Sequence, residues 1–335
     1  MRAAGLIRRR SGHGDAPAEA MGVSEKPGRR RLRLYVLVAV VVAVLGVAAC
    51  TPAPPVVATI AVRARAGLPV VLPDGSVVYV PHDDAVSVID TATNEVIAVV
   101  GVDGPGSGLL GVLPDGSAVY FPSVEGTVSV IDTAMNEVTA TVSAGSGGYS
   151  NAGLVVLPDG SAVYALHSRW EREGVVSVID TATNGVIATV PVGRGSGSPV
   201  VLPDGSAVYV PNEVDGTVSV IDTGTNEVMA TVPVGRAPGN LAGLPDGSAI
   251  YVANPADDAL SLIDTAMNEV IATVPGGRGS GPIAVLPDGS AVYVGNSNGT
   301  VSVIDTATRE LTATVDVGRA ATHGFPVVLP DGSAV

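Results

Sequence analysis

The sequence predicts an all-β protein built from repeated four-stranded units, and three observations point to it. A Leu-Pro-Asp-Gly-Ser segment recurs at intervals of 41 to 45 residues, with its aspartate at positions 74, 115, 159, 204, 246, 288 and 331. The runs beside each copy are rich in Val, Ile and Tyr, which favour strands. The composition is 46% hydrophobic but only 3% aromatic, with 42 Gly, which suits a core of small side chains. A period of roughly 40–45 residues with strand-like content is typical of β-propeller blades.

Each Leu-Pro-Asp-Gly segment predicts a tight turn between two strands. Proline presets φ at the first corner, aspartate can accept a hydrogen bond from its own backbone two residues on, and glycine accepts a positive φ. In the copy between Ile283–Leu286 and Ala291–Val294, the turn joins two apolar runs, as in a β-hairpin. Because the segment recurs seven times, we interpret its aspartates as structural and expect no catalytic residue among them.

Four strands are expected in each repeat: a first strand that ends at the leucine, a second that carries a tyrosine, a third such as 217–221 and a fourth such as 227–232. The tyrosines are expected in the core. A turn such as Asp222–Asn226 joins the third and fourth strands. We expect its polar side chains to cap the turn rather than bind calcium, because the alternating oxygens of a calcium loop are missing. Six full repeats span residues 68–101, 109–143, 153–191, 199–233, 240–275 and 282–316.

A seventh repeat begins at Phe325 but ends at Val335, before its tyrosine, and residues 56–62 match the fourth strand of the later repeats. Pairing the first strand of a chain with the last blade buries the edges of a propeller. We therefore expect residues 56–335 to form a seven-bladed propeller with an incomplete, split seventh blade. We favour truncation of a seven-bladed parent; the alternative is a shift of residues 56–62 into the third-strand position.

The N-terminal residues predict an export signal. Arg29–Arg33 precedes an uncharged run, Leu34–Ala49, whose helical length of about 24 Å is short of a membrane span. A basic head, an apolar middle and small residues before a break are typical of a secretory signal. Val47–Cys50 resembles the lipobox of bacterial lipoproteins, which implies cleavage and lipidation of Cys50.

The domain boundaries follow from this resemblance. Residues 1–49 are expected to be a disordered basic N-terminus and a lipoprotein-type signal peptide, and residues 50–55 a proline-rich tether. The lipid would anchor the protein at the outer face of the cytoplasmic membrane, within the cell envelope. An uncleaved helical anchor, or a plain signal peptide with an incidental cysteine, remains the alternative.

Charge and cysteine content exclude several classes of function. Residues 1–49 carry nine Arg or Lys and three Asp or Glu, so the rest of this −14 chain has a net charge of −20. So acidic a body repels nucleic acid, and we expect no nucleic-acid partner. Cys50 is the only cysteine, which leaves no disulfide framework and no cysteine-based metal site.

The motifs Tyr209–Asn212, Tyr251–Asn254 and Tyr293–Asn296 each read Tyr-Val-x-Asn, and they precede runs such as Val-Ser-Val-Ile-Asp-Thr. These motifs resemble the YVTN β-propeller repeat family of surface-layer and other exported proteins, over about residues 56–335. The resemblance implies the propeller fold and says little about activity. The second and third repeats depart from the motif at Tyr120–Ser123 and Tyr164–His167.

Residues that break the repeat are the candidates for a unique site. In a propeller, the loops between second and third strands share one face with the loops that lead from a fourth strand to the next repeat; we call this the loop face. The third repeat has a longer loop here, in which Arg169 and Arg172 flank Trp170. This loop is either a hot spot for a partner or a place where the tryptophan packs on a neighbouring blade.

Other loop-face residues are candidates for an anion-binding site or a metal site. Four arginines recur there, and they could hold a carboxylate or sulfate of a polysaccharide or pair with acids such as Asp215 and Asp257. These arginines are Arg194, Arg236, Arg278 and Arg319. His82, His167 and His323 share the face but belong to different repeats, so we expect no metal site.

The sequence therefore favours a lipid-anchored, non-enzymatic binding or scaffold module for a protein or an anionic glycan, with no cofactor. Its alternatives are a hydrolase of the propeller lactonase type and an accessory protein of a periplasmic redox system. No set of residues resembles a nucleophile–base pair or a phosphate-binding loop.

Overall fold

The computed structural model describes residues 59–61, 67–106, 109–145, 153–168 and 171–318. The chain divides into two units, Met1–Leu34 and Tyr35–Val335, and every described residue belongs to the second. Within the described ranges, every regular element is a β-strand, and no helix there is long and apolar enough to cross a bilayer.

The described strands form six sheets of four antiparallel strands, each in simple chain order. This confirms the predicted all-β class and its four-stranded blades. The first three sheets comprise β1 (Val70–Val71), β2 (Val77–His82), β3 (Ala85–Asp90) and β4 (Glu95–Gly101); β5 (Gly111–Val112), β6 (Ala118–Pro122), β7 (Thr127–Asp132) and β8 (Glu137–Ser143); and β9 (Gly153–Val156), β10 (Ala162–His167), β11 (Glu173–Asp180) and β12 (Gly185–Arg194).

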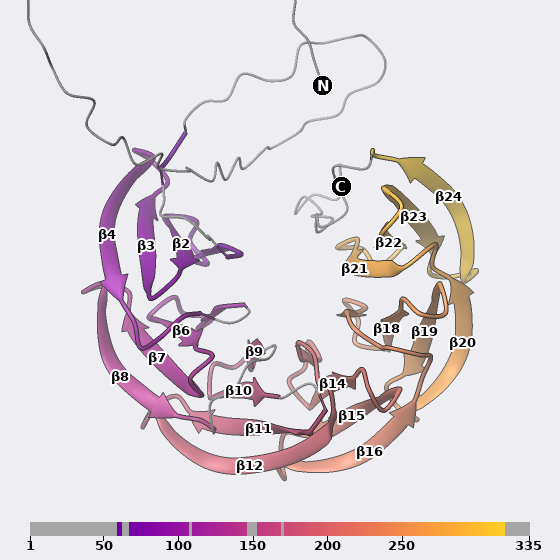
Figure 1. The fold of residues 1–335 in the computed structure, drawn as a ribbon, viewed down its shortest axis with the longest axis horizontal. Coiled ribbons are helices and arrows are strands. Elements are labelled where there is room, and N and C mark those ends of the chain that lie inside the picture. Colours follow the sequence, from indigo (N-terminus) through magenta and orange to yellow (C-terminus); the bar gives the residue numbers. More distant parts are fainter. Residues whose placement is uncertain (1–58, 62–66, 107–108, 146–152, 169–170, 319–335) are drawn as a thin grey trace, which may run out of the picture. The chain divides into compact units, whose positions relative to one another are not determined.

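The last three sheets repeat the same arrangement. They comprise β13 (Val200–Val201), β14 (Ala207–Asn212), β15 (Thr217–Asp222) and β16 (Glu227–Pro233); β17 (Leu241–Gly243), β18 (Ala249–Asn254), β19 (Ala259–Asp264) and β20 (Glu269–Pro275); and β21 (Ser280–Val285), β22 (Ala291–Asn296), β23 (Thr300–Asp305) and β24 (Glu310–Asp316). Figure 1 shows that sheets consecutive in the chain also lie next to each other, in agreement with the contacts between them.

The turn after each first strand has the geometry that the Leu-Pro-Asp-Gly segment predicts. Asp74 Oδ1 accepts hydrogen bonds from the backbone N–H of Ser76 at 3.0 Å and from its hydroxyl at 2.7 Å. Gly75 has a φ of 73°, and the other five described copies lie between 73° and 75°. Such a φ strains any residue with a Cβ, which explains the glycine.

The turn between third and fourth strands is capped in the expected way. Asp90 Oδ1 accepts from the backbone N–H of Thr93 at 2.7 Å and from its hydroxyl at 2.9 Å. Asn94 then takes a left-handed φ of 57°, which asparagine tolerates better than most residues. The equivalent positions with a positive φ are Asn136, Asn184, Asn226, Asn268 and Arg309.

In each of the first four sheets, a tyrosine hydroxyl links the sheet to the turn of the next. Tyr79 donates to Asn136 Oδ1 at 2.9 Å, and burial raises the pKa of Tyr79 to about 12, which keeps this donor protonated. The same bond joins Tyr120 to Asn184, Tyr164 to Asn226 and Tyr209 to Asn268. At the next step the asparagine is replaced by Arg309, and the buried Tyr251 hydroxyl has no partner among the described residues.

The core lies between neighbouring sheets rather than within one. Tyr79 and Val88 of the first sheet belong to the same buried cluster as Phe121 of the second. The outer flank of the sixth sheet differs: Val315 in β24 is 48% exposed, whereas the equivalent Val274 in β20 is 2% exposed. The following sheet buries this valine in the earlier repeats, and no described sheet follows the sixth.

The predicted seventh blade falls almost wholly outside the described residues and stays a prediction. Its expected segments are 56–62 and the chain beyond Phe325, of which only 59–61 are described, without strand structure. Ile60 nevertheless packs on the cluster that Val80 and Ile89 form in the first sheet, so apolar packing continues past that sheet.

Replacing Arg309 with Asn should stabilise the protein. Asparagine would give the buried Tyr251 hydroxyl an acceptor and would suit the φ of 61° at this position. A net hydrogen bond contributes about 1 kcal/mol, so urea unfolding should show a gain of about that size. The reverse change in the preceding turn, Asn268→Arg, is the matched control and should destabilise. If the urea midpoint of R309N lay at or below that of the parent, the hydrogen bond between tyrosine and asparagine would not stabilise the fold.

Stability should fall in acid, below the ordinary aspartate pKa of 3.8. The backbone N–H of Ser76, and then its hydroxyl, lower the pKa of Asp74 below that value, and Ser290 acts likewise on Asp288. A lowered folded-state pKa contributes stability that is present above the unfolded value and is lost as pH falls through the folded one. Melting temperatures measured from pH 7 to pH 2 should therefore drop only below about pH 4. An Asp288→Asn variant should lose less stability over that acid range than the parent does. A parent melting temperature that stays constant from pH 7 to pH 2 would show that these aspartates do not stabilise the fold.

Candidate partner-binding surface

The two sets of loops that define the loop face are joined by main-chain hydrogen bonds. The N–H of Val102, after the first sheet, donates to the carbonyl of Asp84 at 3.0 Å, and the N–H of Val124 donates to Pro105 O at 3.0 Å. Further along, Glu213 N–H donates to Gly195 O at 3.2 Å. The loops thus form a continuous surface from one sheet to the next.

Two of the predicted arginines are engaged in ion pairs between neighbouring sheets. Arg194 Nη2 lies 2.6 Å from Asp215 Oδ1, and its backbone N–H donates to Oδ2 of the same carboxylate at 2.7 Å. That backbone bond is the main cause that lowers the pKa of Asp215. Arg236 and Asp257 repeat the arrangement in the next sheet. Of the two interpretations from the sequence, this geometry favours pairing with nearby acids over binding an external anion.

The other predicted residues are not brought together. The carbonyl of Arg278 accepts from Ser297 N–H at 3.1 Å. Counted back from the third strand, Asn298 stands where Asp215 and Asp257 stand in the preceding sheets, so the carboxylate is replaced by an amide. Arg172 is exposed beside the loop of the third sheet. Four candidates lie outside the described residues, namely Cys50, Arg169, Trp170 and Arg319.

The histidines of the loop face belong to separate sheets. His82 is 2% exposed and its Nε2 lies 2.8 Å from Ser87 Oγ, across the first sheet. Burial lowers the pKa of His167, which stands at the equivalent position in the third sheet. Within the described part of the chain, no group of three or more His, Cys, Asp or Glu could hold a metal ion.

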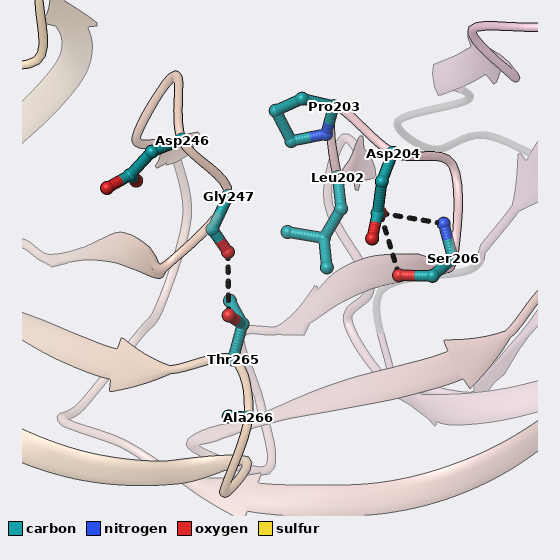
Figure 2. A pocket seen from close by; sticks show the side chains of 8 residues that line it. All are labelled: Leu202, Pro203, Asp204, Ser206, Asp246, Gly247, Thr265 and Ala266. Atoms are coloured by element: carbon teal, nitrogen blue, oxygen red, sulfur yellow. Dashed lines mark hydrogen bonds between the residues drawn. The ribbon is translucent and has the colours of Figure 1, made fainter.

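The described cavities lie on the face opposite to the loop face, which the sequence analysis did not consider. One, of about 510 Å³, opens between the fourth and fifth sheets and is lined by Leu202, Asp204, Asp246 and Thr265 among others. Figure 2 shows Asp204 and Asp246 on opposite sides of this cleft, with Asp204 turned back toward Ser206 and Thr265 bonded to Gly247. A second cleft, of about 380 Å³, recurs one sheet further along.

The two clefts are lined by the same kinds of residue because both lie between recurring turns. Each is the space between one Pro-Asp-Gly turn and the next. In the first cleft, Asp204 and Asp246 each already accept two hydrogen bonds from a serine. The recurring segment was the signal in the sequence that could have located them. As sites, they would present carboxylate oxygens and threonine hydroxyls to a polar ligand.

Comparisons with known proteins bear on the fold alone. No family model and no curated protein matches the chain. Among solved structures, a chain of Kuenenia stuttgartiensis hydrazine synthase is similar, with a TM-score of 0.63 and 21% identity, over 79% of this chain and 89% of that chain. At this identity the likeness extends to the arrangement of the strands and supports the propeller-type, all-β architecture described above.

Proposed function

We propose that this protein is a binding or scaffold module of the cell envelope, which holds a protein or glycan partner on its loop face. The observation that carries this proposal is that recurring and non-recurring polar residues have different surroundings. Those that recur from repeat to repeat, such as Asp74, Asn136 and Tyr79, cap turns or link sheets. Several residues that break the repeat, among them His82, His167 and Arg172, belong to the loop face, whereas Arg309 breaks it at a turn on the opposite face.

The export signal and the lipid anchor on Cys50 belong to the same proposal, as does membership of the YVTN repeat family. Anchoring by lipid needs two acyl chains for stable attachment, which a lipoprotein N-terminus provides. A proline-rich tether at residues 50–55 would hold the propeller close to the membrane, where an envelope partner is within reach.

Replacing Trp170 with Ala should weaken binding of the partner at least tenfold, because truncation of a central aromatic residue typically removes much of the binding energy. The measurement is biolayer interferometry against a partner isolated from envelope extracts. Glu227→Gln, an exposed change at the start of β16 on the opposite side, is the control. Equal affinities for parent and W170A would remove this loop from the proposal.

Replacing Cys50 with Ala should release the protein from membranes. Fractionation of expressing cells, followed by mass spectrometry of the N-terminal peptide, should show acylation in the parent and none in the variant. A C50A protein that stays in the membrane pellet would point instead to an uncleaved helical anchor.

A further inference from the structure

The three methionines in the described part of the chain all lie on the surface. Met135 is 59% exposed, Met229 is 48% exposed and Met267 is 58% exposed. A methionine side chain commonly fills gaps in a core, whereas these three are open to solvent. Cys50, the only cysteine, lies outside the described residues. The thioethers are therefore the sulfur groups that an oxidant can reach in the described part of the chain.

Two of these methionines replace a residue that caps a turn. Met135 and Met267 stand where the other four described turns between third and fourth strands have a threonine. Each of those threonines donates its hydroxyl to the aspartate of the turn, as Thr93 does to Asp90 at 2.9 Å. Methionine has no hydroxyl and keeps the backbone bond, from the N–H of Met267 to Asp264 Oδ1 at 2.9 Å. The turn itself therefore does not require a methionine.

The third methionine touches the link between the fourth and fifth sheets. Asn268 Oδ1 accepts the hydrogen bond of the Tyr209 hydroxyl at 2.8 Å, and Asn268 Nδ2 donates to Met229 Sδ at 3.7 Å. Met229 belongs to β16, and isoleucine or threonine stands at its position in the other described sheets. A thioether sulfur is a weak acceptor. The linking amide is thus held by a strong partner at its oxygen and by a weak one at its nitrogen.

Oxidation changes a weak acceptor of this kind into a strong one. A hydroperoxide transfers one oxygen atom to a thioether: a lone pair of the sulfur forms the S–O bond while the O–O bond breaks. With hydrogen peroxide, the other oxygen leaves as water, the sulfur loses two electrons and the peroxide gains them. The resulting sulfoxide is polar, and its oxygen carries the partial negative charge that attracts an N–H donor. Asn268 Nδ2 already lies within hydrogen-bonding distance of the sulfur.

We propose that Met229 is a site of oxidation by hydroperoxides, and that its sulfoxide oxygen accepts the hydrogen bond of Asn268 Nδ2. The oxidised side chain holds the fourth sheet to the turn of the fifth more tightly than the thioether does. Oxidation of a buried methionine disrupts a core, but the exposure of Met229 leaves the core intact. The inference concerns a junction between sheets and is independent of the partner proposed for the loop face.

The test combines oxidation of the full chain with two substitutions at this junction. Met229→Ile introduces the residue found at the equivalent positions 97, 187 and 271. Asn268→Asp removes the Nδ2 donor and keeps an oxygen acceptor for Tyr209. Parent and variants are treated with dilute hydrogen peroxide under native conditions. Peptide mass spectrometry locates the added oxygen, and urea unfolding is measured before and after treatment.

The parent should carry a sulfoxide at Met229, with Met135 as the control for an exposed methionine away from this junction. In M229I the other methionines are still oxidised, so its change in stability is the reference. Relative to that reference, oxidation should make the unfolding equilibrium constant of the parent about threefold smaller, the size of a modest net hydrogen bond. N268D should respond as M229I does. Methionine sulfoxide reductases of both stereospecificities should return the parent to its initial stability.

Three results would overturn the inference. The first is an unmodified Met229 in a protein whose Met135 is oxidised. The second is a parent whose stability responds to oxidation no more favourably than that of M229I, which would leave the sulfoxide without a bond to the link. The third is an N268D protein that responds as the parent does, since the gain would then come from a donor other than Asn268 Nδ2.

Discussion

The hydroxyl of a buried tyrosine, donated across the gap between two sheets, is the contact on which the architecture depends. It reaches the asparagine of the next turn between third and fourth strands, and that asparagine holds a left-handed backbone. One residue therefore meets two requirements of the turn: asparagine accepts the hydrogen bond of the tyrosine hydroxyl, and its backbone tolerates the positive φ. The bond accompanies the packing of apolar faces at four successive junctions between sheets.

The apolar clusters show why this packing matters. Each sheet is thin, and its valines are buried only when a neighbour covers them, as the contrast between Val274 and Val315 shows. Stability then arises from the interfaces between repeats, as in other repeat architectures. On the loop face, the pairs Arg194–Asp215 and Arg236–Asp257 join the same neighbours, so polar links flank the apolar core on both sides.

Near-identity of the repeats makes departures from it informative. A polar residue that recurs is explained by the fold whenever its hydrogen bonds close within the repeat or with the next one, as for Asp74 and Tyr209. A polar residue left unpaired calls for a different explanation. Among the described residues, the Tyr251 hydroxyl lacks a partner where Arg309 replaces the asparagine. His167 Nε2 also lacks one, as do Asn254 Oδ1 and Asn296 Oδ1 at the equivalent position of later sheets.

The sequence by itself determined the strands, the turns and their order, because these depend on local chemistry: proline and glycine at fixed places, aspartate beside serine or threonine, and alternating runs of valine. It also placed five of the six equivalent tyrosines in the core correctly, whereas Tyr293 is half-buried. Only the tertiary structure decided which arginines form ion pairs, because Arg194 meets Asp215 across a gap between sheets that spacing does not specify. The same holds for the clefts between successive turns. It also holds for the Tyr251 hydroxyl, which has no partner among the described residues, since a missing hydrogen bond is a property of neighbours in space rather than in the chain.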